Sequence, residues 1–295
     1  MSFGAASTRW WLERGQHRKD APAIERSLAW LQTEIGQKKP IAQIDNNVIS
    51  RIVAKRRLDD VSPATVNRSV VEPLRAILRH ADFLGQDIAR IDWRKLKLKE
   101  PPGRVREMTG EEEARLFAAL RQDFHALARF LVATGVRRAE ACMLEWTDVA
   151  LERGEFTVRG KGGTVDRRPL ADAAIAILRQ ERGKHPTRVF TYVVRHPFGG
   201  RRGDLVPIAP DTFSTAYWRA RKAAGLEDLR IHDLRHTAAS RITRVAGIQA
   251  AGRALGHKRI TTTERYSHVS DEDLRAALNK AAPVAAIVET KEKKA

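Results

Sequence analysis

Residues 254–269 have the sequence Ala-Leu-Gly-His-Lys-Arg-Ile-Thr-Thr-Thr-Glu-Arg-Tyr-Ser-His-Val. They contain Tyr266, one of only three tyrosines in 295 residues, beside Arg265 and nine residues after His257. Threonine has a low helix propensity, so three consecutive threonines argue against an interior helix face here. A tyrosine in such a segment, taken alone, is typical of a polar surface turn. The cationic residues elsewhere in the chain suggest a second interpretation, in which they and Tyr266 share one phosphate.

The composition is that of a folded and strongly basic protein. Hydrophobic residues make up 42% of the chain, charged residues make up 31%, and the net charge is +18. Lys and Arg outnumber Asp and Glu in residues 1–100 (19 against 12) and in residues 101–295 (35 against 24). A nucleic acid that contacts both halves is therefore the expected partner.

A membrane surface is the competing partner for a basic protein. However, the sequence has no apolar run near 18 residues and no signal peptide, and its charge is spread through folded segments. The single cysteine, Cys142, rules out an internal disulfide framework, and it fits the reducing cytoplasm, where we expect the protein to act. We therefore favour nucleic acid over a membrane.

Residues 21–95 are expected to form a small helical domain. Apolar stripes predict helices near 21–35 and 47–58, and a third that opens at Ser62-Pro63 and is kinked by Pro73. Residues 1–20 lack periodicity and are expected to be a partly loose N-terminal tail, which tryptophans at 10 and 11 could anchor.

The first turns of the third helix contain a candidate DNA contact. Thr65, Asn67 and Arg68 lie there, where backbone N–H groups and the helix dipole favour an anion. A solvated helix start is the simpler interpretation of these three residues when they are considered alone.

Residues 96–107 are expected to be a basic linker between two domains. Two prolines and a glycine in this segment stop both helix and strand. Lys95, Lys97 and Lys99 would suit a chain that lies along phosphates. A Thr-x-x-Glu capping box at Thr109 follows, so the second domain is expected to cover 108–270.

The second domain should be helical with a small antiparallel sheet. Residues 155–159 alternate like a strand and return after Gly160-Lys161-Gly162-Gly163, so Lys161 is expected at a hairpin tip. These glycines do not have the spacing of a nucleotide-binding loop. Arg137 begins a helix, where the positive helix end opposes a cation, and a bound anion would remove that conflict. Glu140 lies close enough along the helix to brace the Arg137 guanidinium.

Two histidines four residues apart, His232 and His236, resemble half of a zinc site. Arg235 between them opposes a dication, and no other His or Cys cluster completes a ligand set. We therefore predict that the protein binds no metal.

Four motifs in the second half occur in a recognisable order. They are Thr-Gly-x-Arg-x-x-Glu from Thr134, Gly-Lys-Gly from Gly160, His-x-x-Arg from His232, and Leu-Gly-His from Leu255 with Tyr266 nine residues later. This set resembles the tyrosine recombinase (phage integrase, Xer-like) family over residues 105–280, and more weakly over residues 20–95. The resemblance implies a two-domain DNA clamp, in which a helical core-binding domain precedes the catalytic domain.

The resemblance also implies how the site residues divide the chemistry. Arg137 and Arg235 would hold the non-bridging oxygens of a phosphodiester, since a guanidinium fork can bind two of them at once. Tyr266 would be the nucleophile that forms a 3′-phosphotyrosine bond, and this bond would let DNA be rejoined without a cofactor. The remaining implied roles are a base or phosphate ligand (His232), a proton donor to the leaving 5′ oxygen (Lys161), a phosphate ligand (His257) and an arginine brace (Glu140).

The family works on double-stranded DNA as a tetramer on paired sites, with accessory DNA-bending or directionality proteins in some systems. The C-terminal helix and tail, residues 271–295, would pack on a neighbouring protomer or on their own domain. Two other functions fit the same residues. A type IB topoisomerase-like enzyme would relax DNA without pairing two sites, and a DNA-binding regulator would use the scaffold without cleavage.

Overall fold

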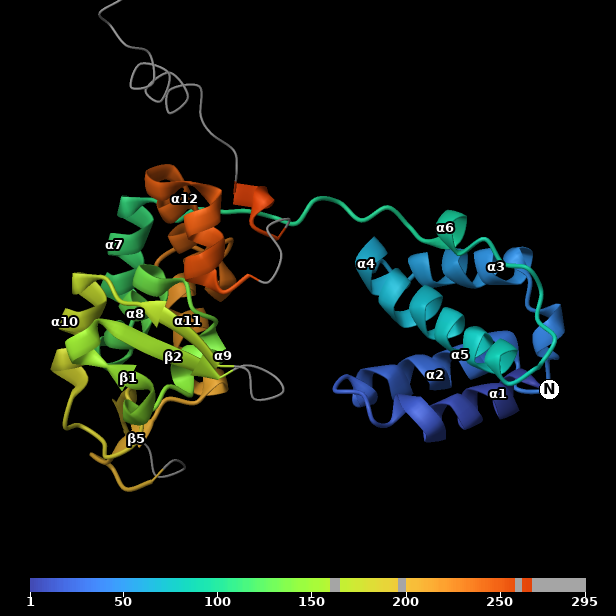
Figure 1. Cartoon of the computed structure of the whole chain (residues 1–295), viewed down its shortest axis with the longest axis horizontal. Coiled ribbons are helices and arrows are strands. Elements are labelled where there is room, and N and C mark those ends of the chain that lie inside the picture. Colours follow the sequence, from blue (N-terminus) through green and yellow to red (C-terminus); the bar gives the residue numbers. More distant parts are fainter. Residues whose placement is uncertain (160–164, 196–199, 258–261, 267–295) are drawn as a thin grey trace, which may run out of the picture. The chain divides into compact units, whose positions relative to one another are not determined.

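A computed structural model of the chain describes residues 1–159, 165–195, 200–257 and 262–266. The chain divides into two compact units, Met1–Pro102 and Gly103–Ala295, called unit 1 and unit 2 below. Both units are mainly helical, and the described strands form two small antiparallel sheets in unit 2 (Figure 1). The expected fold class, mainly α with a small antiparallel sheet, is confirmed.

Unit 1 is a group of helices around one apolar core. Leu31, Ile49 and Leu74 come from three different helices and are completely buried. The elements are α1 (Phe3–Trp10), the π-helix η1 (Trp11–Gly15), α2 (Ala21–Ile35), the 3-10 helix η2 (Ile41–Gln43), α3 (Asn46–Arg57), α4 (Pro63–Val66), the π-helix η3 (Asn67–Val71), α5 (Glu72–Phe83) and α6 (Trp93–Leu96).

The N-terminal segment is helical and packed, so the prediction of a loose tail over residues 1–20 is wrong for most of that segment. Phe3, Ala6 and Trp10 lie on one face of α1 and belong to the core of unit 1. The Ser2 side chain accepts a hydrogen bond from the Ala5 N–H and caps the helix. Three apolar positions are too few to give a periodic signal in the sequence, but they are sufficient to bury one face of a short helix.

The third helix of unit 1 is interrupted just before Pro73, close to the expected kink. Ser62 caps α4 by accepting from the Thr65 N–H, and a five-residue π-helix then leads into α5. Proline has no N–H to donate to the preceding turn, and the wider π turn lies where that hydrogen bond is missing.

Unit 2 surrounds the buried helix α8. Its elements are α7 (Gly110–Ala119), the 3-10 helix η4 (Gln122–Phe124), α8 (His125–Thr134), α9 (Arg138–Cys142), the 3-10 helix η5 (Trp146–Asp148), β1 (Val149–Ala150), the 3-10 helix η6 (Leu151–Arg153), β2 (Glu155–Arg159), β3 (Val165–Pro169), α10 (Asp172–Glu181), β4 (Thr191–Val193), β5 (Leu205–Pro207), α11 (Pro210–Ala223), α12 (Ile231–Leu255) and the 3-10 helix η10 (Glu264–Tyr266).

Helix α8 joins the sheet to the helices of unit 2. Its Phe130 ring lies 5.5 Å from the ring of Phe156 on β2 and 5.2 Å from the ring of Phe190. The sheet has the order β1-β2-β3, and Phe156 is paired with Arg168 in its register. On its other sides α8 packs against α10 and α12 (Figure 1). The sheet and α12 are thus fixed relative to one another through one buried helix.

Helix α12 consists of two segments. Gly247 inside it has φ 82° and ψ 171°, which are not helical values, so the helix is kinked there. The first segment begins with the His-x-x-Arg motif, and the second ends at the Leu-Gly-His motif. Among the residues that the structure describes, every helix falls short of the length or the apolar content that a membrane crossing requires.

Candidate active site

Arg235 lies in the second turn of α12 and is buried, with only 4% of its surface exposed. Its guanidinium donates to the backbone carbonyl of Gly135 (2.5 Å), to that of Leu255 (3.0 Å) and to Nε2 of His257 (2.9 Å). A guanidinium has five N–H donors, so two remain for another acceptor. These contacts come from the end of α8 and the end of α12, which therefore fix the arginine in one orientation.

Arg137 lies immediately before α9, on the wall of a cavity of about 340 Å³ that Arg235 and His232 also line. Its side chain is 51% exposed. Glu140 accepts from the Arg137 guanidinium at 2.8 Å and from the Arg137 backbone N–H at 3.1 Å. The carboxylate therefore holds both the side chain and the backbone of Arg137, and it caps the helix that follows.

The electrostatics of this cavity favour an anion. Burial lowers the pKa of Arg235 to about 10, and the nearby positive charges of Arg137 and Arg168 add to that effect, whereas Glu140 opposes it. A lowered arginine pKa means that the cation is poorly compensated where it lies. A phosphate bound between Arg137 and Arg235 would supply the missing negative charge.

His257 follows the left-handed Gly256 that ends α12. Its Nε2 lies 2.9 Å from the Arg235 guanidinium, and its Nδ1 lies 2.8 Å from Oγ1 of Thr263. Because arginine can only donate, Nε2 must be the acceptor, and the ring proton of neutral His257 is then on Nδ1. His257 would need a second proton, or the other tautomer, before its Nε2 could donate to a phosphate.

Tyr266 is in η10 and is buried, with 6% of its surface exposed. Its ring packs with Ala239 and Leu255 of α12. Its hydroxyl lies 2.7 Å from Nδ1 of His236, which is itself 5% exposed. The structure therefore brings the expected nucleophile to the same helix that carries Arg235.

The two histidines of α12 differ in their environment. His232 is exposed, whereas His236 is buried, and their rings meet edge to face with centroids 4.7 Å apart. In the sequence, His236 resembles only half of a metal site. The four-residue spacing that suggested a metal also places both rings on one face of the helix, and this was the available signal for a shared site.

Arg168 on β3 is a second residue that sequence reasoning did not identify. It is 3% exposed and forms an ion pair with Asp166 (2.8 Å), and its guanidinium lies 3.9 Å from Glu140. A Cβ on Gly256 would lie 2.2 Å from Arg168 and 2.5 Å from Asp166. The pair thus packs directly against the turn that carries His257. The alternation along β3 indicates that the Arg168 side chain points inward, but it does not indicate which element covers that side chain.

Two of the expected features lie outside the described residues. Lys161 falls in the connection between β2 and β3, which pair in register on either side of it. The terminal segment, residues 271–295, is also outside them. Among the residues that are described, no group of His, Cys, Asp and Glu side chains could hold a metal ion.

In unit 1 the expected DNA contact at Asn67 is not at the surface, so that prediction is corrected. Asn67 is 1% exposed, and its amide donates to the Leu98 carbonyl and to Glu100, both at 2.9 Å. Its carbonyl accepts from the Leu98 N–H, also at 2.9 Å. Asn67 therefore anchors the chain that leaves unit 1, and its partners lie too far along the sequence to be inferred from a helix start. Thr65 is half-buried, and Arg68 is exposed.

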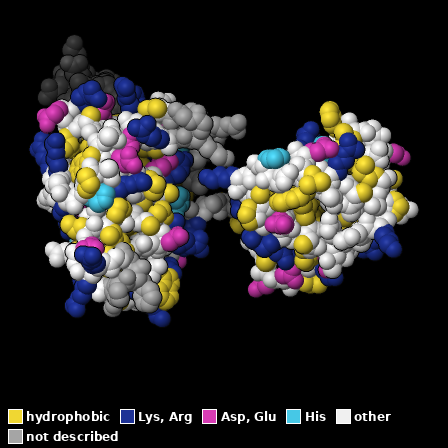
Figure 2. Space-filling view, turned by 90° about the horizontal axis from the view of Figure 1, so that it is seen from below, with side chains coloured by type: hydrophobic (Ala, Val, Ile, Leu, Met, Phe, Trp, Pro, Cys, Tyr) yellow, Lys and Arg dark blue, Asp and Glu magenta, His cyan; other side chains and the backbone are white. Residues whose placement is uncertain are grey.

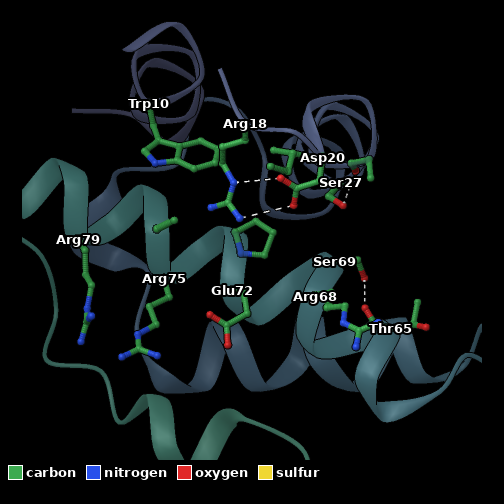
Figure 3. Close-up of a pocket in the computed structure, with 14 residues that line it drawn as sticks. Trp10, Arg18, Asp20, Ser27, Thr65, Arg68, Ser69, Glu72, Arg75 and Arg79 are labelled. Carbon is green, nitrogen blue, oxygen red and sulfur yellow. Dashed lines mark hydrogen bonds and ion pairs between the residues drawn. The ribbon is translucent and has the colours of Figure 1, made fainter. Parts of the chain in front are cut away.

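A cleft of about 890 Å³ separates α2 from α5, and Arg68 lines it. Figure 3 shows Arg68, Glu72, Arg75 and Arg79 along one wall, with Trp10, Arg18 and Asp20 on the other side. The arginines at 68, 75 and 79 recur at helical spacing and share one face. Nε of Arg75 is buried without a hydrogen-bond partner among the described residues. The cleft is thus a basic surface wider than the three residues predicted from the sequence.

The cations of the expected linker are partly used inside each unit. Lys97 pairs with Glu72 (3.3 Å) and Lys95 lies 3.9 Å from Asp92, while Lys99 is exposed. In unit 2, Arg104 and Arg106 both contact Asp228. Figure 2 shows Lys and Arg side chains on the visible face of each unit, interspersed with acidic and hydrophobic ones.

Residues 106–273 match the model of the phage integrase family. The chain is 27% identical to an integrase of Salmonella phage P22, over 93% of this chain and 78% of that protein. It is also 27% identical to tyrosine recombinase XerC of Xanthomonas campestris pv. campestris (strain B100), over 90% of this chain and 81% of that protein.

Solved structures share the fold across both units. The Tn1549 transposon integrase in complex with a circular intermediate DNA has a TM-score of 0.74 at 16% identity, covering 96% of this chain and 100% of that one. A lambda integrase dimer bound to a core site has a TM-score of 0.70 at 19% identity, covering 90% of this chain and 77% of that one.

Proposed function

This chain belongs to the phage integrase family of tyrosine recombinases, which are DNA breaking and rejoining enzymes, and we propose that it cuts DNA through a 3′-phosphotyrosine bond at Tyr266. The observation that carries the proposal is the buried guanidinium of Arg235, close to Arg137 and Arg168 and to the Tyr266 phenol. Such a concentration of cations around one nucleophile is suited to a phosphodiester.

The chemistry is divided among groups of different kinds. Arg137 and Arg235 bind the non-bridging oxygens and neutralise the charge that grows in the transition state. Glu140 fixes Arg137 through its two contacts. Lys161 gives a proton to the leaving 5′ oxygen, and His232 and His257 bind the phosphate. The phosphotyrosine bond retains the energy of the broken bond, so a 5′ hydroxyl from another strand can reverse the step.

The two units grip the duplex mainly through backbone phosphates. In unit 1 the arginines of the α2–α5 cleft and the exposed Lys99 supply the cations. Phosphate contacts of this kind release counterions, so affinity should fall steeply as salt rises. A tetramer on two paired sites carries out strand exchange. Accessory DNA-bending or directionality proteins would set which reaction, integration, excision or dimer resolution, is favoured.

Covalent trapping tests the proposal. The protein is incubated with a library of random-sequence duplexes, each carrying a nick that lets the cleaved fragment diffuse away. Adducts that survive SDS are then sequenced, and the phosphorylated residue is mapped by mass spectrometry. We expect wild type to give adducts at Tyr266, and Tyr266→Phe to bind the recovered duplex without forming any.

Three results would redirect the proposal. An adduct that persists in Tyr266→Phe would remove this residue from the role of nucleophile. Relaxation of supercoiled plasmid by monomeric protein, without pairing of two sites, would indicate a topoisomerase-like enzyme. Binding without any adduct on any duplex would leave a DNA-binding protein that does not cleave.

A further inference from the structure

The hydroxyl of Tyr266 has a buried histidine beside it. Nδ1 of His236 lies 2.7 Å from the phenol oxygen, and the two rings have centroids 5.5 Å apart. Both residues are at most 6% exposed. A hydrogen bond between a phenol and an imidazole nitrogen in such a place is well ordered and shielded from water. It involves the oxygen that must attack phosphorus if Tyr266 is the nucleophile.

The groups described around His236 are two rings and the charged residues near Arg235. His232 faces it from its own helix and Tyr266 from η10. The charged residues that act on the adjoining Arg235 are Arg137, Glu140 and Arg168. Helix α8 also packs on α12, but its titratable residues, His125 and Arg129, contact Phe117 instead. Arg137 and Arg168 therefore outnumber Glu140 among the charges that act on Arg235, and the rings of His232 and Tyr266 pack against His236 itself.

We propose that His236 is the base that takes the phenolic proton of Tyr266 when the phenol attacks the scissile phosphate. This rests on the proposed function, because it assigns one proton of that reaction. The new bond forms between the Tyr266 oxygen and phosphorus, and the bond from phosphorus to the 5′ oxygen breaks. The phenolic proton moves to Nδ1 of His236, and the 5′ oxygen receives its proton from a different donor, Lys161.

His236 is better placed for this step than His232, for which the family resemblance implies a role as base or phosphate ligand. His232 is exposed on the cavity that Arg137 and Arg235 line, where it can reach a phosphate oxygen. His236 is already within hydrogen-bond distance of the nucleophile. Histidine has an ordinary pKa of about 6.5 and phenol one of about 10, so the proton must move as the new bond forms.

Single-turnover cleavage of the trapped nicked duplex, measured from pH 5 to pH 9, tests this assignment. Wild type should lose activity at low pH, as His236 becomes protonated and can no longer accept a proton. His236→Asn places an amide where Nδ1 was, so it keeps a hydrogen bond to Tyr266 but cannot take a proton at neutral pH. We expect its rate to fall roughly 10²- to 10⁴-fold, and its acid limb to disappear.

The matched control is His232→Asn, four residues earlier on the same helix. It should retain the acid limb, although its rate will fall through weaker phosphate binding. A second substrate separates the two proton transfers. A duplex with sulfur in place of the bridging 5′ oxygen has a leaving group that needs no proton, so it should rescue Lys161→Ala but not His236→Asn.

Several results would overturn the assignment. They are an acid limb that survives in His236→Asn, an acid limb lost only in His232→Asn, and rescue of His236→Asn by the sulfur duplex. Circular dichroism and thermal melting check that the variant is folded, and His236→Gln is used if it is not. The wild-type profile is independent of either variant, since cleavage that stays constant down to pH 5 also refutes the assignment. Wild-type adducts at Tyr266 establish the proposed function separately.

Discussion

Replacing Gly256 by alanine should damage unit 2 far more than the same change at a glycine of equal backbone conformation. Gly256 has φ 65° and ψ 43°, and Gly154 has φ 60° and ψ 39°. An added Cβ at 154 would meet only the Ile175 side chain, at 3.7 Å. An added Cβ at 256 would lie 2.2 Å from Nη2 of Arg168 and 2.5 Å from Oδ2 of Asp166. Gly154→Ala is therefore a matched control.

The magnitude follows from two separate costs. A side chain in the left-handed region costs roughly 1–2 kcal/mol, and both variants bear that cost. In Gly256→Ala the buried Arg168 and its partner Asp166 must also move, and such overpacking typically costs about 1–3 kcal/mol. We therefore expect a loss of about 1–2 kcal/mol for Gly154→Ala and about 2–5 kcal/mol for Gly256→Ala. For domains of 150–250 residues, each kcal/mol lowers Tm by roughly 2–4 °C.

Calorimetry of the two variants measures this difference, and a third variant assigns its cause. Arg168→Ala removes the obstructing guanidinium, so adding Gly256→Ala to it should cost less than adding Gly256→Ala to wild type. Such non-additivity is expected for residues in contact. Equal Tm losses at 154 and 256, or additive losses in the double variant, would show that Arg168 does not pack on this turn as described.

Three further changes test other parts of the structure. Asn67→Ala should destabilise unit 1 by about 1–3 kcal/mol, measured by chemical denaturation, because the Leu98 N–H loses its acceptor; an unchanged midpoint would contradict this. The pKa of Glu112 is lowered by the Thr109 N–H and then by Arg106. The ionised carboxylate therefore stabilises the fold at pH values above the ordinary pKa of Glu, and this stabilisation is lost as pH falls through the lower pKa of Glu112 in the folded protein. The Tm difference between wild type and Glu112→Gln should thus be largest near neutral pH and vanish in acid, and a difference independent of pH would be inconsistent with it. Arg235→Lys should reduce cleavage at least about 100-fold with DNA binding nearly intact, because lysine cannot bridge two phosphate oxygens, and near wild-type rates would show that no such fork is used.

Much of the architecture could be predicted from local patterns. The stripe over 21–35 coincides with α2, and the Thr109 capping box starts α7 as expected. Both signals depend on neighbours along the chain, which the sequence displays directly. The helix before residue 16 could not be predicted in this way, because its three apolar anchors gain their burial from α2 and α5, which are separate elements of the chain.

The residues of the candidate site could be predicted from the sequence better than the contacts between them. Motif order pointed to Arg137, Arg235, His257 and Tyr266. In the structure Arg235 contacts His257 and shares a cavity wall with Arg137, and Tyr266 packs against α12. The partner of the Tyr266 hydroxyl, His236, could not be assigned, because 30 residues separate the two and only the folded chain makes them meet. Asn67 is the opposite case, in which a polar residue with the appearance of a surface ligand is used internally.

The carbonyls that hold Arg235 belong to the backbone of Gly135 and Leu255. No point mutation can delete a main-chain carbonyl, so this support is largely insensitive to genetic change in the residues that provide it. The exception is steric, because a Cβ on Gly135 would lie 2.5 Å from the Leu255 side chain. A library selected for loss of cleavage should therefore be rich in substitutions of Gly135 and poor in conservative apolar substitutions of Leu255.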